Sequence, residues 1–195
     1  MILTFKEVFD IIAMSLIVGY IFSGFLKKYA HRSYDNYDPL AGKPGFDWKS
    51  LKFAVIAVAP AIILHEFAHK FIAISFGLEA VFNAAYFWLF IGLMMKIMGT
   101  GFIFFVPAYV SIINPAGIGI TPFAYSLVAF AGPAVNAVLW LITSLIIKKN
   151  LINRKYLPLA YITKRINMFL FIFNMLPIPG FDGFKVFQGL LQTIF

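Results

Sequence analysis

The chain has 195 residues, of which 62% are hydrophobic and only 12% are charged. A soluble domain carries about a quarter charged residues, so the composition excludes an ordinary globular surface. The formal net charge is +8. Its cations gather mainly in two polar connections, 27–52 and 148–165, which suits contact with a lipid bilayer and its anionic headgroups, and we expect no nucleic-acid partner. The chain contains no cysteine, so disulfides and thiolate metal ligands are excluded.

The first half of the chain contains two segments long enough to cross a membrane, which takes about 20 mainly apolar residues. Residues 4–26 are the first, with Glu7 and Asp10 close enough to the start to lie among the headgroups. Residues 27–52 are polar and rich in turn-forming residues, which predicts a surface loop. Residues 53–76 form the second predicted span.

The middle of the chain is less regular. Residues 82–98 are apolar but short, so they cross the membrane, dip into it and return, or lie buried in protein, with Lys96 reaching an interface. Residues 101–120 combine aromatic and β-branched residues with several glycines and prolines, which favours strands and turns over a helix. Residues 121–147 form the third predicted span.

The C-terminal part begins with the second polar connection, 148–165. An apolar helix is predicted from residue 166 until Pro177 and Pro179, where a helix must end. Residues 184–195 are predicted to form a short terminal helix. Because the sequence shows no internal repeat and no separate soluble segment, we expect a single membrane domain over residues 1–195.

A short motif, HEFAH at residues 65–69, lies inside the second predicted span. Histidines four residues apart share one face of a helix and lie about 6 Å apart along its axis. His65 and His69 can therefore both reach one zinc ion at about 2.0–2.1 Å. Glu66, between them, would flank the metal as a general base. Pro60, five residues before His65, is predicted to start the helix; the alternative is that it kinks the helix and admits water.

The motif is improbable by chance. With three histidines and three glutamates in the chain, random placement would produce it with a probability on the order of one in a thousand. Ionisable side chains inside an apolar span are also costly and indicate function. The alternatives are a cluster that only hydrogen-bonds neighbouring helices, and a stand-alone binding site for a metal or proton.

Zinc needs a third protein ligand, with the fourth position left to water. His31 lies in a polar loop, so the candidates are the acidic residues Asp10, Glu79 and Asp182. Asp10 and Glu79 fall near the ends of apolar segments, where a hydrated position accounts for them. Asp182 lies beside a helix break, and broken backbone at membrane depth requires a polar cavity. A turn or capping aspartate is the alternative for Asp182.

Three segments of the sequence resemble the signature set of the site-2 protease family of intramembrane zinc metalloproteases: HEFAHK at 65–70, AGP at 131–133 and NMLPIPGFDG at 174–183. The resemblance implies that His65, His69 and Asp182 bind zinc and that Glu66 is the catalytic acid/base. It extends over about residues 53–190, which would form the catalytic core.

The resemblance also predicts the fold class, a mainly α, polytopic transmembrane helical protein with a short membrane-associated β-hairpin and a broken helix at the active site. Residues 101–120 would supply the hairpin, residues 4–26 would be a peripheral span, and 82–98 is an insertion relative to the simplest family pattern. An exposed strand edge in 101–120 is a candidate for pairing with an unwound substrate. A hairpin that only seals the site is the alternative.

The predicted function is that of an intramembrane zinc metalloprotease, a multi-pass protein of the cell membrane that hydrolyses transmembrane protein substrates. Glu66 would take the proton of a zinc-bound water and pass it to the leaving amine. Asn174 would hydrogen-bond the substrate carbonyl or developing oxyanion, or else cap the broken helix. Lys70 would orient a carboxylate or lie at an interface. The alternative function is that of a membrane metal-ion or proton transporter or binding protein that uses the same His/Glu/Asp cluster.

Overall fold

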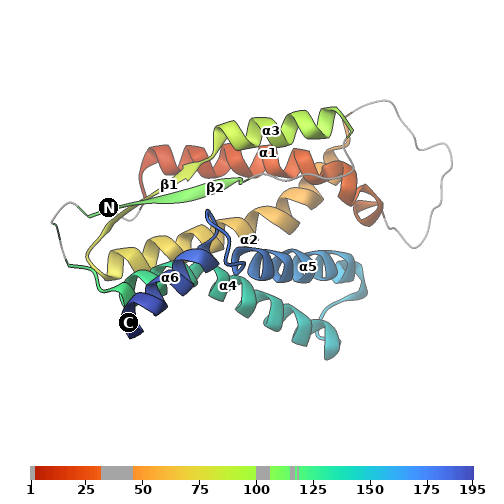
Figure 1. Ribbon diagram of the computed structural model, residues 1–195. Coiled ribbons are helices and arrows are strands. Elements are labelled where there is room, and N and C mark those ends of the chain that lie inside the picture. The colour runs from red at the N-terminus through yellow and green to blue at the C-terminus, as the bar shows by residue number, and fades with distance from the viewer. Residues whose placement is uncertain (1–2, 32–45, 100–105, 115–116, 118) are drawn as a thin grey trace.

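The protein is described by a computed structural model over residues 3–31, 46–99, 106–114, 117 and 119–195. Helices make up most of it, and a two-stranded sheet lies between the α1–α3 pair and the helix α2 (Figure 1). The elements follow in the order α1 (Phe5–Ala30), α2 (Trp48–Ser75), β1 (Glu79–Ala84), α3 (Tyr86–Ile97), β2 (Ala108–Ile113), α4 (Pro122–Lys148), η1 (Arg154–Tyr156), α5 (Leu157–Asn174) and α6 (Asp182–Ile194).

Three helices, α1, α2 and α4, are long and apolar enough to cross a membrane. With 26, 28 and 27 residues, each exceeds the roughly 30 Å of the hydrocarbon core at about 1.5 Å per residue. They coincide with the three predicted spans, so the predicted fold class is confirmed. Helix α3 has only 12 residues, about 18 Å, which excludes a full crossing by residues 82–98.

The starts of the long helices follow from local hydrogen bonds. Thr4 and Glu7 form a capping box at α1, and the Thr121 hydroxyl caps α4 by accepting from Ala124 N at 3.1 Å. At α2, Asp47 accepts from the Ser50 amide at 3.0 Å and from the Ser50 hydroxyl at 2.7 Å. Burial would raise the pKa of the Asp47 carboxyl, but these hydrogen bonds lower it to about 2.

Pro60 does not start a helix, contrary to the sequence-based prediction. Helix α2 begins at Trp48, and Pro60 lies in its interior on an exposed side. Proline has no N–H for the carbonyl four residues earlier, at Ile56, so one helical hydrogen bond is missing in the turn before the HEFAH motif. The capping bond of Asp47 to Ser50, and not the proline, sets the start of this helix.

The two strands are antiparallel and in register from Glu79 opposite Ile113 to Ala84 opposite Ala108. The predicted sheet is confirmed, and so is a strand within residues 101–120, but the partner strand was placed wrongly. Strand β1 precedes α3, and its last three residues were predicted to be part of the apolar segment 82–98. It forms a strand because alternate side chains, including the fully buried Phe82, face the core.

The C-terminal helices differ from the prediction mainly in their starts. Helix α5 begins at Leu157, inside the predicted second polar connection, and ends at Asn174, where the break was expected. Helix α6, the predicted terminal helix, begins at Asp182. Gly180 takes φ +100° in the turn between them, a conformation that glycine adopts readily.

Several charged residues are enclosed by the protein. Glu7, Asp10 and Lys70 are only 1–2% exposed, and Lys70 bonds the Glu7 carboxylate, as one of its two predicted roles required. The Lys96 ammonium bonds the Tyr20 carbonyl of α1 and the Ser23 hydroxyl, the latter at 2.9 Å. Each group has an internal partner that a span taken alone does not reveal.

The pairing of β1 with β2 predicts a specific cross-link in a chain with no natural cysteine. Ala80 and Ile112 lie directly opposite each other, at a position where the Cα atoms of an antiparallel pair approach to about 4.5 Å. The double variant Ala80→Cys/Ile112→Cys should form a disulfide on mild oxidation, visible as a mobility shift. The control pair Ala80→Cys/Val110→Cys is offset by two residues and should not. Cross-linking of the control alone would contradict the register.

Candidate metal centre

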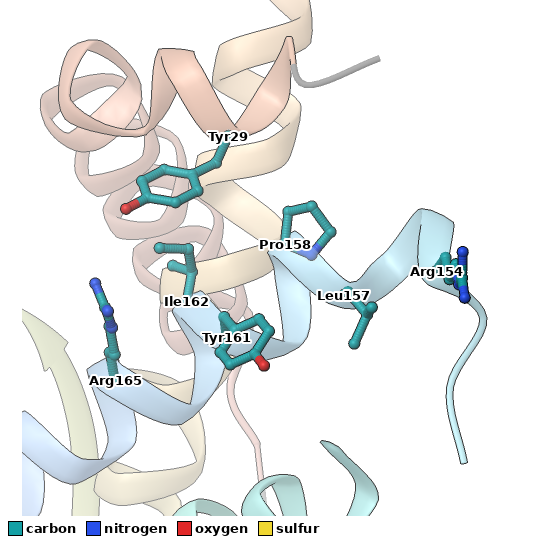
Figure 2. A pocket seen from close by; sticks show the side chains of 7 residues that line it. All are labelled: Tyr29, Arg154, Leu157, Pro158, Tyr161, Ile162 and Arg165. Atoms are coloured by element: carbon teal, nitrogen blue, oxygen red, sulfur yellow. The ribbon is translucent and has the colours of Figure 1, made fainter. Parts of the chain in front are cut away.

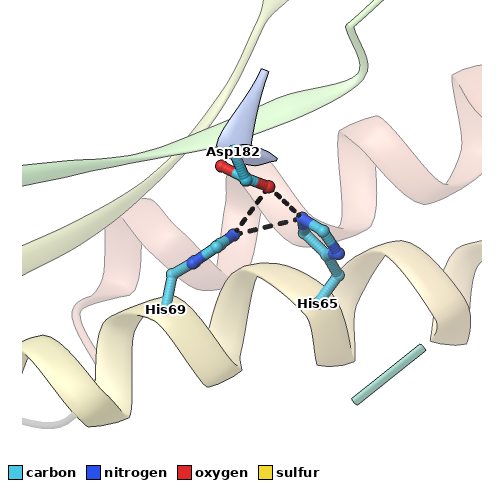
Figure 3. Close-up of side chains that lie close together, drawn as sticks. All are labelled: His65, His69 and Asp182. Carbon is cyan, nitrogen blue, oxygen red and sulfur yellow. Dashed lines mark hydrogen bonds and ion pairs between the residues drawn. The ribbon is translucent and has the colours of Figure 1, made fainter. Parts of the chain in front are cut away.

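Two histidines of α2 and one aspartate of α6 meet at a single point (Figure 3). The Asp182 Oδ2 atom lies 3.1 Å from Nε2 of His65 and 3.2 Å from Nε2 of His69. The two Nε2 atoms are 3.1 Å apart. The structure therefore brings together the three residues predicted to bind zinc, across more than a hundred positions of sequence.

The donor set fits a zinc ion. Two imidazole nitrogens and one carboxylate oxygen are ligands that zinc takes in catalytic sites, with one position left open. Ligand atoms around a tetrahedral zinc lie about 3.3 Å apart, given bond lengths of about 2.0–2.1 Å, and the three donor atoms here are spaced at 3.1–3.2 Å. His65 and His69 are 6% and 7% exposed, so the site is largely shielded.

The other ring nitrogen of each histidine is held by an acceptor. His65 Nδ1 lies 2.6 Å from Oδ1 of Asn136, and His69 Nδ1 lies 2.7 Å from the Val128 carbonyl oxygen. A carbonyl oxygen can only accept, so Nδ1 carries the proton in both rings. Each Nε2 is then left with its lone pair facing the centre, which is the tautomer that binds a metal.

The orientation of Asn136 is fixed by further bonds. Its amide nitrogen donates to the Ala61 carbonyl at 3.1 Å and to Oδ1 of Asn167 at 2.9 Å, which leaves its oxygen for His65. Asn167 in turn donates to the Thr163 carbonyl at 2.8 Å. Asn136 and Asn167 are 0% and 1% exposed. This chain of amides joins α2, α4 and α5 and orients one ring of the centre.

Gly132 lets the backbone of α4 approach the centre. A Cβ atom at this position would lie 2.3 Å from Nε2 of His69 and 2.6 Å from Nε2 of His65. Any side chain here would therefore occupy the space between the donor atoms, where the metal would lie. The glycine of the AGP segment is thus required by close approach.

Asp182 is positioned by the packing of α6. A Cβ at Gly183 would lie 2.4 Å from the Met175 carbonyl, and one at Gly189 would lie 2.3 Å from the Ser126 hydroxyl, so small residues allow α6 to contact α4 and the end of α5. Burial would raise the pKa of the Asp182 carboxyl, but the two histidine rings beside it hold this pKa well below its usual range.

Two further residues were predicted to act in catalysis, Glu66 and Asn174. Glu66 is 9% exposed, and the ionisable groups that act on its carboxylate are His65, His69, Asp182 and Lys185. Asn174 is the last residue of α5, directly before the helix break. Its predicted role toward a substrate stays a prediction.

A cavity of about 400 Å³ lies elsewhere, between the end of α1 and the start of α5 (Figure 2). Its lining includes Tyr29, Arg154, Tyr161 and Arg165 and none of the residues of the metal centre. This cavity is thus separate from the place where metal chemistry would occur.

Asn136 and Asn167 were missed by the sequence reasoning. Both are amides inside apolar helices, and Asn136 follows Gly132 by one helical turn. Polar side chains at membrane depth indicate function, and that signal was applied only to ionisable residues. The carbonyl of Val128 carries no sequence signal, because every residue offers one.

Fold and site together define a helical protein with three helices able to span a membrane and a His/His/Asp group able to hold a metal ion. The chain is 31% identical over 186 residues to the protein named "Putative zinc metalloprotease MJ0611" of Methanocaldococcus jannaschii, and the match covers 94% of this chain and 84% of that protein. The chain therefore belongs to this metalloprotease family. No family model and no solved structure matches it significantly.

The bond from Asn136 to His65 predicts a loss of metal affinity without loss of a ligand. In Asn136→Leu the His65 ring loses the acceptor that fixes its tautomer, so the zinc affinity should fall about 10- to 100-fold. Competition with a chelator measures the affinity. Thr143→Val, which removes a polar group from the same helix away from the centre, should leave it unchanged. Equal affinity of Asn136→Leu and wild type would show that this bond does not orient the ligand.

Proposed function

We propose that the chain is an intramembrane zinc metalloprotease of the site-2 protease type, which hydrolyses peptide bonds of transmembrane proteins. The observation that carries the proposal is the convergence of His65, His69 and Asp182 on one point, with both ring tautomers set for metal binding. The metalloprotease relative supports the same chemistry. A Glu next to the first histidine supplies the one further group that hydrolysis needs.

The depth of the centre supports a substrate inside the membrane. His65 lies ten residues before the end of α2 at Ser75, about 15 Å along the helix axis. That is about half of a hydrocarbon core of roughly 30 Å. Exposed apolar side chains such as Leu64 and Phe71 flank the motif on the same helix, so the protein surface around it suits lipid. A peptide bond that reaches the centre would come from a membrane-embedded segment.

The chain's own residues divide the work of peptide hydrolysis. Zinc bound at this centre would polarise the scissile carbonyl and acidify the attacking water. The Glu66 carboxylate, which lies next to the ligand His65 in α2, accepts the proton of that water and delivers it to the leaving amine. Asn136 and the Val128 carbonyl hold the two imidazoles in place while negative charge develops on the substrate carbonyl oxygen. Asn174 donates its amide to the substrate carbonyl.

Strand β2 offers a place for the substrate backbone. The amides of Phe82 and Ala84 in β1 bond α1 and not β2, so by alternation the main-chain groups of Val110 and Ile112 point away from β1. An unwound segment in the bilayer must satisfy its own polar groups, and pairing with this edge would do so. The Val110 side chain packs in the cluster that contains Val128, next to His69.

Replacement of the proposed base separates proteolysis from ion transport. Glu66→Gln should retain the wild-type zinc content but lose about a hundredfold or more of the cleavage rate on a transmembrane substrate, because the proton acceptor is gone. Cleavage is followed by gel mobility in detergent or vesicles, and metal by elemental analysis. Wild-type cleavage by Glu66→Gln would refute the proposed role. A wild-type chain that moves metal ions or protons across vesicles without proteolysis would be a transporter.

Removal of one backbone N–H tests whether substrate pairs with the edge of β2 that points away from β1. Proline at Ile103 or Phe105, in the same predicted segment 101–120, would also break a strand edge, but both positions lie outside the described residues. Ile112→Pro deletes an N–H that points away from β1, so the β1–β2 ladder should survive. Cleavage of a transmembrane substrate should fall about tenfold or more, at unchanged zinc content. Ile112→Val keeps the N–H and serves as the control. Equal cleavage by both variants would exclude strand pairing at this edge.

A further inference from the structure

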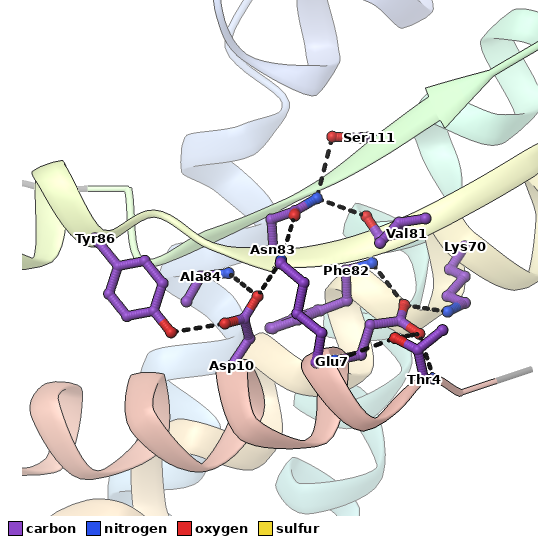
Figure 4. A network of polar contacts seen from close by, with 11 residues as sticks. Thr4, Glu7, Asp10, Lys70, Val81, Phe82, Asn83, Ala84, Tyr86 and Ser111 are labelled. Carbon is purple, nitrogen blue, oxygen red and sulfur yellow. Dashed lines mark hydrogen bonds and ion pairs between the residues drawn. The ribbon is translucent and has the colours of Figure 1, made fainter.

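Two carboxylates of α1 are buried in the interior of the protein (Figure 4). Glu7 is 1% exposed and Asp10 is 2% exposed. A buried carboxylate is costly unless it is paired and hydrogen-bonded, and neither belongs to the metal centre. The bonds that these two groups make therefore indicate what they do.

Glu7 uses both of its oxygens. Its Oε1 accepts from the backbone N–H of Phe82 at 2.7 Å and from the ammonium of Lys70. Its Oε2 accepts from the backbone N–H of Thr4 at 2.8 Å and from the Thr4 hydroxyl at 3.1 Å. One side chain thus joins the start of α1, strand β1 and helix α2.

Asp10, one turn further along α1, is bonded in a similar way. Its Oδ2 accepts from the backbone N–H of Ala84 at 3.4 Å and from Lys6 at 2.8 Å. Its Oδ1 accepts from the Tyr86 hydroxyl at 2.6 Å. This hydrogen bond raises the pKa of Tyr86 to about 12, so the hydroxyl remains a donor over the physiological range.

The two strand amides share one edge of the sheet. Phe82 and Ala84 are two residues apart, so their N–H groups point in the same direction, away from β2. The carboxylate oxygens of Glu7 and Asp10 therefore stand where the carbonyl oxygens of a third strand would stand. With this edge of β1 occupied, the other edge of β2 is the side of the described sheet on which a further strand can add.

Lys70 connects this arrangement to the metal centre. It follows His69 directly in α2 and is 1% exposed. Its ammonium shares the Glu7 oxygen that also accepts from Phe82. The sheet is therefore fixed, through one carboxylate, to the helical turn that carries a ligand.

We propose that Glu7 and Asp10 are positioning residues that replace a third strand: they close the outer edge of β1, direct the substrate to β2, and hold the sheet in place beside the zinc ligands through Lys70. This inference rests on the proposed proteolytic function. It assigns a role in substrate placement to a span that the sequence placed outside the catalytic core.

The test uses substitutions that leave no buried charge unpaired, because a lone Lys70 would destabilise the fold. In Glu7→Met/Lys70→Met the acceptor of the Phe82 amide is gone and the ion pair is replaced by apolar side chains. Glu7→Gln/Lys70→Met restores an amide oxygen as acceptor at the same position. Glu79→Gln, an exposed carboxylate on the same strand, is the matched control.

Hydrogen exchange of the full-length protein in detergent reports on the strand edge. In Glu7→Met/Lys70→Met, the Phe82 amide should exchange about 10- to 150-fold faster, since a hydrogen bond to a charged acceptor is lost. The KM for a transmembrane substrate should rise about tenfold or more, with kcat and zinc content near wild type. Glu7→Gln/Lys70→Met should recover most of the protection and of the KM, and Glu79→Gln should match wild type throughout.

The opposite outcomes overturn the proposal. An unchanged Phe82 exchange rate would show that Glu7 does not hold the strand. Faster exchange with an unchanged KM would show that the strand edge does not place substrate, and loss of zinc would assign these residues to the metal centre. If the double variant does not fold, Asp10→Ala takes its place. The Ala84 amide should then exchange faster, and the KM for the substrate should rise, at unchanged zinc content. A wild-type protein that cleaves no transmembrane substrate would refute the proposed function. The exchange rate of the Phe82 amide would still show whether Glu7 closes the outer edge of β1.

Discussion

In an apolar medium every polar group has to find a partner within the protein, and this requirement shapes the structure described here. Each buried side-chain nitrogen and oxygen among the described residues has a hydrogen-bond partner. Asn136 supports His65, the Val128 carbonyl supports His69, and Glu7 pairs with Lys70. Because unpaired groups at membrane depth are expensive, these pairings specify how the helices are arranged, and the metal centre is one result of that arrangement.

Close approach of helices is the second requirement, and small residues meet it. Gly132 brings α4 against the donor nitrogens of His65 and His69, while Gly183 and Gly189 let α6 lie against α5 and α4. Packing of this kind is the main source of helix association in membranes, where burial of apolar surface contributes little. The Asp182 carboxylate reaches the histidines because α6 can pack this closely. The close packing of the helices therefore determines the geometry of the metal centre.

The sequence was sufficient for features that are local. Apolar length predicted α1, α2 and α4, proline predicted the end of α5, and the spacing of HEFAH placed His65 and His69 on one face. The choice of Asp182 over Asp10 and Glu79 rested on a broken helix at membrane depth, and the structure brings that residue to the two histidines.

Features that depend on distant partners were not accessible in this way. The particular partners of Asp10 and Lys70 were not predicted because a span considered alone does not show them, whereas α1, β1 and α2 together do. Strand β1 was merged with the apolar segment after it, since six residues give too little periodicity to separate a strand from a helix. Asn136 was overlooked because its role appears only when α4 lies beside α2.

Metal analysis of the purified protein tests the central claim most directly. The account predicts zinc at a ratio of about one per chain in the wild type, and its loss in Asp182→Ala, because the carboxylate of α6 completes a three-ligand site. A wild type that holds no tightly bound metal, or an Asp182→Ala variant that keeps its zinc in full, would contradict the account.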